Sequence, residues 1–363
     1  MSFRIAGVGT AVPHEMITQD DAARLAVELA GSSAGQTSTV QALYRRAGVR
    51  KRHSALITSS TNGRPATQSF FPVAVNADDR GPTTGDRMRC YEDVALDLAT
   101  SAARTAFFDG DTAPGEIDHL VTVSCTGFSA PGVDVGLIEN LGLNRGVSRT
   151  HVGFMGCHGA LNGLRVAAAL SKAASKSKVL LCCVELCSLH HQYAANAQQL
   201  VANALFSDGA AAMVGFDTDS TDAPWRLADQ FSYVLPETAD LMAWRIGDNG
   251  FDMRLSPRVP SVIQEMLRPW LCGQLSRHGL EIADVRGWAI HPGGPRILTA
   301  CAVSLELEPA CLEPSQQVLA DYGNMSSPTV LFILNQLRER GECLPCVVMA
   351  FGPGLTIEAA LIT

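Results

Sequence analysis

Two short turns share one pattern and indicate how the chain folds. They read Gly153-Phe-Met-Gly-Cys-His-Gly-Ala160 and Tyr322-Gly-Asn-Met-Ser-Ser327. Each turn places a glycine directly before a reactive or hydrogen-bonding residue, Cys157 in the first and Asn324 in the second. Small residues and a helical run follow in both. The two glycines lie 167 positions apart, which indicates that the second half of the chain is a diverged copy of the first.

A second pair of segments supports this duplication. Residues 115–124 (Gly-Glu-Ile-Asp-His-Leu-Val-Thr-Val-Ser) and 280–290 (Leu-Glu-Ile-Ala-Asp-Val-Arg-Gly-Trp-Ala-Ile) both run from an acidic helix end into an apolar strand. Their Glu-Ile pairs lie 165 positions apart, close to the separation of the two glycines. We therefore predict two related halves in which Cys157 and Asn324 occupy equivalent strand-to-helix turns.

Apolar runs of strand length alternate with helical stretches along the chain. The predicted strands are Ile5–Val8, Leu120–Ser124, Lys178–Val184, Ala210–Gly215, Gly287–Ile290, Val347–Phe351 and Leu355–Leu361. The predicted helices include Tyr91–Phe107, Ala160–Ser175 and Pro328–Arg340. This alternation is typical of an α/β fold with a mainly parallel sheet that helices cover on both faces.

A polar segment, Asp217-Thr-Asp-Ser-Thr-Asp-Ala-Pro224, interrupts the alternation. We place the boundary there, between an N-terminal half at 1–219 that carries Cys157 and a C-terminal half at 220–363. The chain has 363 residues. This exceeds the roughly 250–300 residues at which a single core stops growing, so length also favours two halves.

Composition excludes several classes of function. Asp and Glu number 36 against 28 for Lys and Arg, a net charge of −8, whereas nucleic-acid binding relies on clustered positive charge. With 47% hydrophobic and 18% charged residues, the chain has the composition of a folded protein. No run reaches the ~18 consecutive apolar residues of a membrane helix. We expect neither a nucleic-acid nor a membrane partner.

Cysteine usage and the first residues indicate a cytoplasmic protein with reduced thiols. The 11 cysteines are odd in number, and Met1-Ser-Phe-Arg-Ile-Ala-Gly-Val-Gly9 has no charged and apolar regions of a secretory signal. Cys343 and Cys346 form a lone Cys-x-x-Cys pair with no second pair and no nearby histidine. Because a structural zinc site needs four such ligands, we predict no metal site.

The residue most suited to a nucleophile is Cys157. Backbone N–H groups and the positive end of a helix dipole lower the pKa of a thiol at a helix start, and flanking glycines let a substrate approach closely. The alternative is that Cys157 is a small buried apolar residue, as expected for most of the other cysteines.

Two further residues complete a candidate constellation. His291 follows a predicted strand and precedes Pro292-Gly-Gly-Pro295, so a shaped turn holds it at the carboxyl edge of a sheet. Asn324 stands at a helix start, where its ordinary role is that of an N-cap.

A cysteine with a remote histidine and asparagine is suited to nucleophilic acyl chemistry, either in a papain-like protease or in a Claisen condensation. In the condensation the histidine and asparagine donate hydrogen bonds to a thioester carbonyl. The lack of protease signatures favours the condensation.

Several blocks of sequence extend this pattern. They read Leu205-Phe-Ser-Asp-Gly-Ala-Ala-Ala212, Ile290-His-Pro-Gly-Gly-Pro295, Tyr322-Gly-Asn-Met-Ser-Ser327 and Phe351-Gly-Pro-Gly-Leu-Thr356. In this order they resemble the signature blocks of type III polyketide synthases, the chalcone synthase-like family, and the resemblance covers essentially the whole chain. The alternatives are a single-condensation enzyme like ketoacyl-carrier-protein synthase III and a relative that binds acyl groups without turnover.

The resemblance implies a thiolase-type fold, layered α-β-α-β-α with mixed, mainly parallel sheets, in a homodimer. It implies that an acyl-CoA starter loads onto Cys157, that malonyl-CoA extends it by decarboxylative condensation, and that the chain cyclises to a pyrone, a resorcinol or another phenolic product. His291 would activate the thiol as an imidazolium–thiolate pair and donate to the oxyanion, and Asn324 would assist decarboxylation. No cofactor is implied. The starter and the number of extensions stay open.

The resemblance also assigns residues to the substrate pocket. Phe206 matches a gatekeeping aromatic, Met253 stands where plant enzymes have a second one, and Trp244 stands where they have glycine. Cys125 takes the place of a threonine. Ser326 and Gly294, which lie in the quoted blocks, complete the set. His158, directly after the nucleophile, replaces an aromatic residue and receives no role.

A basic run precedes these blocks. Residues 45–52 carry five cationic side chains and match in placement the segment that contacts CoA in the family. We expect Arg46 and Arg50 to bind CoA phosphates, together with Arg296 after the Gly-Gly-Pro turn. The alternatives for such a run are a solvated helix face and an RNA-contact patch.

Overall fold

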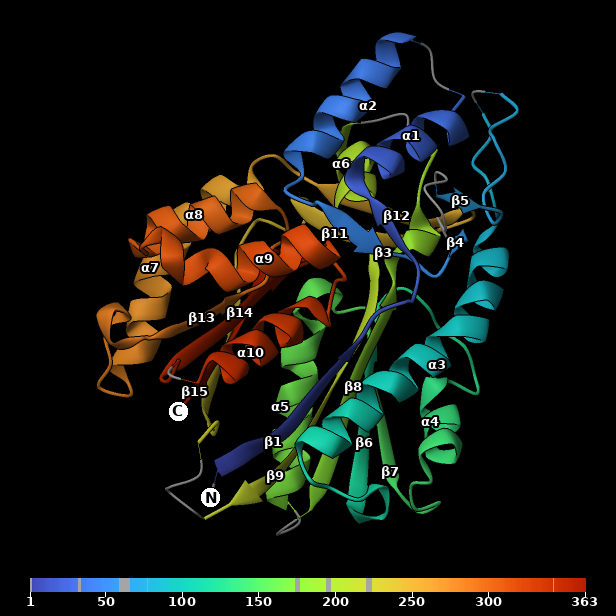
Figure 1. Ribbon diagram of the computed structural model, residues 1–363. Helices are drawn as coiled ribbons and strands as arrows, with labels where there is room; N and C mark the ends of the chain where they lie inside the picture. The colour runs from blue at the N-terminus through green and yellow to red at the C-terminus, as the bar shows by residue number, and fades with distance from the viewer. Residues whose placement is uncertain are drawn as a thin grey trace.

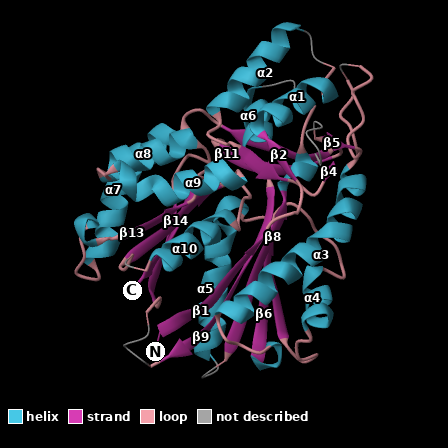
Figure 2. Cartoon of the chain, in the orientation of Figure 1, coloured by secondary structure: helices cyan, strands magenta, loops and turns pink. Residues whose placement is uncertain are grey.

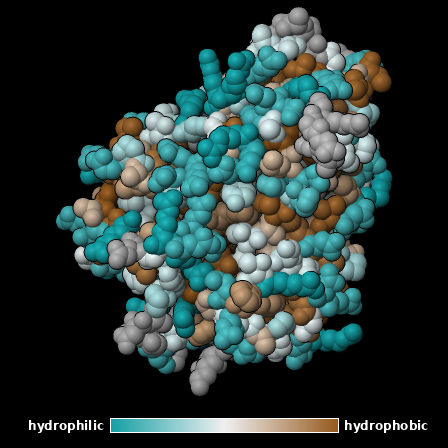
Figure 3. Space-filling model, in the orientation of Figure 1, coloured by the Kyte–Doolittle hydropathy of each residue, from teal (hydrophilic) through white to brown (hydrophobic). Residues whose placement is uncertain are grey.

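The computed structural model describes residues 2–31, 34–58, 66–76, 78–173, 177–193, 197–219, 224–341 and 343–363. Two main sheets and the helices around them make up most of this structure, and both chain termini lie at the same end (Figure 1). The face seen in Figure 3 intersperses hydrophilic and apolar side chains, as is usual for a protein surface.

The first sheet has five strands in the order β1-β9-β8-β6-β7. In that order they are β1 (Ser2–Ala11), β9 (Asp208–Thr218), β8 (Lys178–Leu186), β6 (Ile117–Ser124) and β7 (Ser148–Gly153). Strand β9 runs antiparallel to both β1 and β8, whereas β6 runs parallel to both β8 and β7. Strand β7 therefore forms one edge of the sheet.

The second sheet has four strands in the order β10-β15-β14-β13. They are β10 (Leu227–Val234), β15 (Thr356–Ile362), β14 (Cys346–Gly352) and β13 (Gly287–Ile290). Strand β15 runs antiparallel to β10 and β14, and β13 runs parallel to β14. The second sheet thus repeats the order and directions of β1, β9, β8 and β6.

The two sheets are mixed, as predicted, but they are not mainly parallel. Four pairings, β1–β9, β8–β9, β10–β15 and β14–β15, are antiparallel, and three are parallel. The reason is visible at β14 and β15, which the short turn at 353–355 joins as a hairpin. A continuous apolar run marks a strand buried on both faces and carries no information about its direction.

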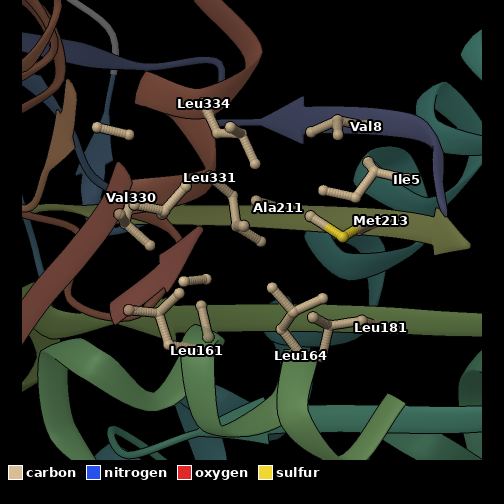
Figure 4. Packing of buried hydrophobic residues seen from close by; sticks show 14 of the residues in the cluster. Ile5, Val8, Leu161, Leu164, Leu181, Ala211, Met213, Val330, Leu331 and Leu334 are labelled. Atoms are coloured by element: carbon tan, nitrogen blue, oxygen red, sulfur yellow. The ribbon is translucent and has the colours of Figure 1, made fainter. Parts of the chain in front are cut away.

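Five layers result from how the helices cover the sheets. Helices α5 (Gly159–Ala173) and α10 (Thr329–Arg340) lie between the two sheets and share one core with both. Figure 4 shows that core, where Leu164 of α5 and Leu331 of α10 meet Ile5 and Met213 of the first sheet. The outer faces are covered by α3 (Thr84–Asp109) with α4 (Val133–Leu141), and by α7 (Val259–Ser276) with α8 (Pro295–Leu305).

Alternation along the strands explains the layering. Val121 and Val123 of β6 face the central helices. Leu120, the residue before them, points to the opposite face of the sheet and packs against α3 and α4. Helix α7 buries one residue every four positions against the second sheet: Val259, Ile263, Leu267, Leu271 and Leu275. The predicted α/β class and α-β-α-β-α layering are confirmed.

Smaller elements cover one end of both sheets (Figure 2). They include β2 (Met16–Thr18), α1 (Gln19–Leu29), α2 (Ala34–Arg46), β3 (Lys51–His53), β4 (Ile57–Thr58), β5 (Thr67–Gln68), α6 (Ala197–Leu205), β11 (Met242–Gly247) and β12 (Gly250–Leu255). Helix α9 (Glu313–Tyr322) leads into the turn before α10. No helix among the described residues is both long and apolar enough to cross a membrane.

Each predicted strand and helix has a counterpart in the structure. The end predicted for one helix, Ser175, and residue 220, where we place the boundary between the halves, lie outside the described residues. On either side of that boundary, β9 belongs to the first sheet and β10 to the second.

Candidate active site

Cys157 lies in η3 (Gly156–His158), the short helical turn between β7 and α5. Gly156 has a φ of +72°, a left-handed value that side-chain-bearing residues rarely adopt. A Cβ atom there would lie 2.7 Å from Cδ of Pro353, because the 353–355 turn packs against the nucleophile turn. The glycine before Cys157 is therefore required by both backbone conformation and space.

Asn324 occupies the matching turn before α10. Gly323 has a φ of +73°, nearly the value of Gly156, and Asn324 itself is 2% exposed. The backbone N–H of Asn324 donates to the Leu205 carbonyl at 2.9 Å, and its Oδ1 accepts from the Ser326 N–H at 2.8 Å. This occupies the side-chain oxygen and leaves the NH2 group as the donor available to the pocket.

His291 is the first residue after β13. Its backbone N–H donates to the Met349 carbonyl of β14 at 2.8 Å, and the residue is 1% exposed. Neither ring nitrogen of His291 has a hydrogen-bond partner among the residues that the structure describes. Because buried polar groups are usually paired, an imidazole without a protein partner beside a pocket is suited to bond a substrate atom.

Cys157, His291 and Asn324 line one narrow inner pocket. Its wall includes Phe206, Met253 and residues of α6, α8 and β14. An adjoining part of the pocket, on the other side of Cys157, is lined by Cys125, Trp244 and Ser326. The structure thus brings the three predicted catalytic residues together. Each part holds only about 20 Å³ of open space, which makes the inner pocket narrow.

Burial favours the neutral forms of both Cys157 and His291, which opposes the expected imidazolium–thiolate pair. Burial raises the pKa of Cys157 to about 11, although hydrogen bonds from Ser326 and Asn324 lower it. Burial lowers the pKa of His291 to about 3, and the charge of His158 adds to this. Desolvation thus opposes the effect of the helix start on the thiol and disfavours charge on either side chain.

A buried carboxylate lies behind the nucleophile. Glu185 of β8 is 0% exposed and accepts hydrogen bonds from the backbone N–H groups of Cys125 and Thr126, at 2.9 Å and 3.0 Å. The hydroxyl groups of Thr126 and Ser327 donate to it at 2.6 Å each. Burial raises the pKa of Glu185, and these hydrogen bonds oppose the rise. The network joins β6 and β8 of the first half to the Asn324 turn of the second.

The predicted substrate-pocket residues lie at the pocket except one. Trp244 and Met253 face each other across the β11–β12 hairpin, and Trp244 Nε1 donates to the Cys125 carbonyl at 2.9 Å. Phe206 and Trp244 are in edge-to-face contact with ring centroids 6.0 Å apart. Gly294 instead lines an outer pocket, and its neighbour Gly293 lines both.

The outer pocket shares part of its lining with the inner one and has an open volume of about 530 Å³. Arg46 and Arg296, two predicted CoA contacts, line it together with residues of α2, α6 and α8. Arg50 does not line it, because its guanidinium forms an ion pair with Asp321 at 2.7 Å. Leu205 and Gly293 are among the residues shared by the two pockets.

The basic run is only partly available to an anion. Arg52 is 6% exposed, and its guanidinium donates to the carbonyls of Asn203, Ala204 and Phe206 at 2.7–2.8 Å. It therefore satisfies the carboxyl end of α6 rather than a phosphate. The sequence pattern of five cations does not distinguish a buried arginine from a solvated one.

Sequence reasoning missed Glu185 and Gly293. A signal for Glu185 was present, since it is a lone carboxylate in the apolar run Val179-Leu-Leu-Cys-Cys-Val-Glu-Leu186. Charged residues are almost never buried without partners, so such a residue indicates a polar network. Among the described residues, no group of three His, Cys, Asp or Glu side chains is placed to hold a metal ion.

Comparison with known proteins places the whole chain in one family. The N-terminal domain model of chalcone and stilbene synthases matches residues 3–218, and the C-terminal domain model of the same family matches 226–363. An alpha-pyrone synthesis polyketide synthase-like protein of Mycobacterium tuberculosis is 33% identical, over 98% of this chain and 90% of its own length. The 1,3,6,8-tetrahydroxynaphthalene synthase of Streptomyces peucetius is 34% identical, over 99% and 92% respectively.

Solved structures agree with this assignment. The crystal structure of PKS-I from the brown alga Ectocarpus siliculosus superposes with a TM-score of 0.92 and 31% identity, covering 99% of this chain and 98% of that one. The C-terminal type III polyketide synthase domain of Steely1 from Dictyostelium superposes with a TM-score of 0.88 and 27% identity, covering 100% and 99%.

Proposed function

The chain belongs to the chalcone and stilbene synthase family and is a type III polyketide synthase, and on this premise we propose how its residues perform the reaction. The observation that carries the proposal is the convergence of Cys157, His291 and Asn324 on one pocket that shares lining residues with the Arg46–Arg296 pocket. Acyl-CoA and malonyl-CoA are the substrates of this enzyme family. In this proposal they enter through the outer pocket.

Loading of the starter uses Cys157 and His291. The Cys157 sulfur attacks the thioester carbon of an acyl-CoA, and the bond from that carbon to the CoA sulfur breaks. A ring nitrogen of His291 takes the thiol proton and passes it to the departing CoA sulfur. Burial favours the neutral forms of both groups, so in this proposal the proton moves as the sulfur attacks.

Extension uses the donors of His291 and Asn324. When malonyl-CoA loses its carboxylate as CO2, the electron pair left behind delocalises onto the thioester oxygen. In this proposal the Asn324 NH2 group and a His291 N–H donate hydrogen bonds to that oxygen and so stabilise the enolate. The enolate carbon then attacks the acyl group on Cys157 and releases the cysteine sulfur.

Cyclisation of the extended chain gives a pyrone or a phenolic ring in this proposal. It is supported by the names of two similar proteins, one an alpha-pyrone synthesis protein and the other a tetrahydroxynaphthalene synthase. The narrow pocket between Trp244 and Met253 favours a compact product. Because the substrates are CoA thioesters, we place the reaction in the cytoplasm.

We also propose that two copies of the chain associate along β7. This edge strand is exposed at 148–151, and the neighbouring side chains of Phe128, Phe154 and Met155 are 42–45% exposed. An unpaired edge strand next to a group of exposed apolar residues is typical of a protein interface. Replacing Phe154 with serine should convert a dimer to a monomer in analytical ultracentrifugation. A parent protein that sediments as a monomer would contradict the proposal.

The activity is tested with purified protein, labelled malonyl-CoA and a panel of acyl-CoA starters. We expect CO2 release, an acyl adduct on Cys157 by mass spectrometry, and a product that contains several two-carbon units and a ring. The Cys157→Ala variant should lose chain extension and keep some malonyl-CoA decarboxylation, because the enolate donors remain. A product with a single two-carbon extension would identify the enzyme as a ketoacyl synthase instead.

A further inference from the structure

A buried arginine holds the carboxyl end of α6. Arg52 of β3 is 6% exposed, and its guanidinium donates to the carbonyls of Asn203 and Phe206 from Nη1 and to that of Ala204 from Nη2. The last carbonyls of a helix have no partner within it, and here one side chain bonds two of them and the carbonyl of the residue that follows the helix. Arg52 therefore fixes the backbone that carries Phe206, an aromatic residue of the inner pocket.

Two further groups orient the guanidinium. Its Nη2 also donates to Oε1 of Gln19, and Nε2 of Gln19 donates to the carbonyls of Ala204 and Tyr44 at 2.9 Å and 3.0 Å. The ring of Tyr44 lies 5.5 Å from Cζ of Arg52, in a cation–π contact. A lysine carries one compact ammonium on a flexible stem, so it cannot replace a planar guanidinium among these separated acceptors.

The same segment is bonded to the Asn324 turn through the backbone. The N–H of Asn324 donates to the Leu205 carbonyl at 2.9 Å, and the N–H of Ser207 donates to the Asn324 carbonyl at 3.0 Å. Leu205 and Ser207 flank Phe206, so Phe206 and Asn324 pair as residues of parallel strands do. A shift of the end of α6 would therefore move the backbone of Asn324.

We propose that Arg52 is a positioning residue for decarboxylation, because it holds the end of α6 and, through it, the backbone of Asn324. The inference rests on the role proposed above for Asn324 as a donor to the enolate oxygen. Arg52 is not among the described residues that line the inner or the outer pocket, so it acts on the reaction through these backbone contacts. Stabilisation of a developing charge depends on how exactly the donor is placed.

The first measurement needs no substrate. It follows amide hydrogen exchange by mass spectrometry in peptides that span 203–207 and 322–327, in the parent and in Arg52→Lys. A peptide of β8 is the internal reference. The matched control is Arg87→Lys, because Arg87 is 0% exposed and also donates to backbone carbonyls, at 2.9 Å to Pro82 and at 3.0 Å to His191, which belong to other segments.

We expect exchange in both peptides, relative to the reference, to become about tenfold faster in Arg52→Lys and to stay at the parent value in Arg87→Lys. The physical reason is that the acceptors of the Ser207 and Asn324 N–H groups are no longer held in place. Equal relative exchange in the parent and Arg52→Lys overturns the inference. Equal increases in both variants also overturn it, because they would reflect a general loss of stability.

The second measurement is release of labelled CO2 from malonyl-CoA without a starter. In Arg52→Lys we expect kcat to fall about 10–10²-fold while KM changes less than about threefold, because the outer pocket is untouched. A kcat at the parent value contradicts the inference.

The Gln19→Leu variant keeps the inference testable if Arg52→Lys does not fold. It removes the acceptor that orients the guanidinium, so we expect smaller changes in the same directions, and unchanged exchange and kcat overturn the inference. A parent protein that releases no CO2 would contradict the proposed function, whereas the exchange measurement would still decide whether Arg52 holds the Asn324 turn.

Discussion

The two halves share a strand order but differ at corresponding positions around the pocket. Strands β6 and β13 both end at the pocket, and the next residue is Cys125 in the first half and His291 in the second. The backbone N–H of Cys125 donates to Glu185, and its Sγ lies 3.3 Å from Ser326. The ring of His291 has no such partner in the described part of the chain.

The two halves thus contribute differently to the pocket. The first supplies polar groups that are paired with one another, and the second supplies hydrogen-bond donors. The first half pairs its polar groups around Glu185. The second half leaves the His291 imidazole unpaired among the described residues and directs the Asn324 amide towards the Cys157 thiol. An unpaired buried group costs free energy. We therefore expect a substrate oxygen to bond the His291 imidazole, because that hydrogen bond would recover the cost.

The largest expected effect on stability comes from the core that the two halves share. Replacing Leu331, 1% exposed between the sheets, with alanine should lower the free energy of unfolding by about 2–5 kcal/mol, through lost burial and a cavity. Urea unfolding followed by both fluorescence and circular dichroism should still show one transition, because α10 packs on both sheets. The control is Val303→Ala on the exposed face of α8. Two separated transitions would mean that the halves unfold independently.

The donor role of the second half is tested at Asn324. The Asn324→Ala variant should decarboxylate malonyl-CoA about 10²–10³-fold more slowly, equivalent to about 2.7–4 kcal/mol, by analogy with the loss of one oxyanion donor. The assay is release of labelled CO2 without a starter. The Cys157→Ala variant is the comparison, since it should retain decarboxylation. If the Asn324→Ala variant decarboxylated malonyl-CoA at the parent rate, Asn324 would not be the donor that stabilises the enolate.

Lowering the pH should destabilise both halves, because each half buries histidines in the neutral form. Burial lowers the pKa of His190 and of His191 in the first half, and of His291 in the second, to about 3 each. The unfolded chain binds protons that the folded chain does not, so stability falls as the pH falls from 6.5 towards 3. The expected loss is on the order of 1.4 kcal/mol per pH unit for each group.

Urea midpoints at pH 7, 6 and 5 measure this loss. The His190→Gln variant should show a shallower dependence on pH than the parent, because one of the three groups has been removed. A free energy of unfolding that stays constant over this range would show that these side chains are not buried as neutral imidazoles.

The smallest expected effect is a change of product rather than of rate. Replacing Trp244 with alanine removes the indole that narrows the pocket beside Cys125. With one fixed starter, product mass should rise by whole two-carbon units, while malonyl-CoA consumption changes by less than about tenfold. Trp270→Phe on α7, which packs against Phe231 and Tyr233 away from the pocket, is the control. An unchanged product mass would show that the indole does not limit chain length.

Local sequence patterns predicted the elements and the turns well because each depends on near neighbours. Gly156 and Gly323 have nearly equal left-handed φ values, as expected for equivalent turns before Cys157 and Asn324. The direction of β15 and the burial of Arg52 could not be predicted, since both depend on packing between distant segments. The imidazolium–thiolate pair of Cys157 and His291 stays a prediction, and the desolvation that opposes it is a property of the assembled pocket that local sequence does not encode.

The hydrogen bond from Ser327 to Glu185 has a consequence for synthesis of the chain. Its two residues lie 142 positions apart, so a ribosome completes the carboxylate's strand long before it supplies that hydroxyl. Helix α10, which completes the central layer, and strand β15 of the second sheet emerge later still. N-terminal segments of a growing chain begin to fold first. The hydrogen bonds around Glu185 are therefore complete only after the segment that carries Ser327 has been synthesised.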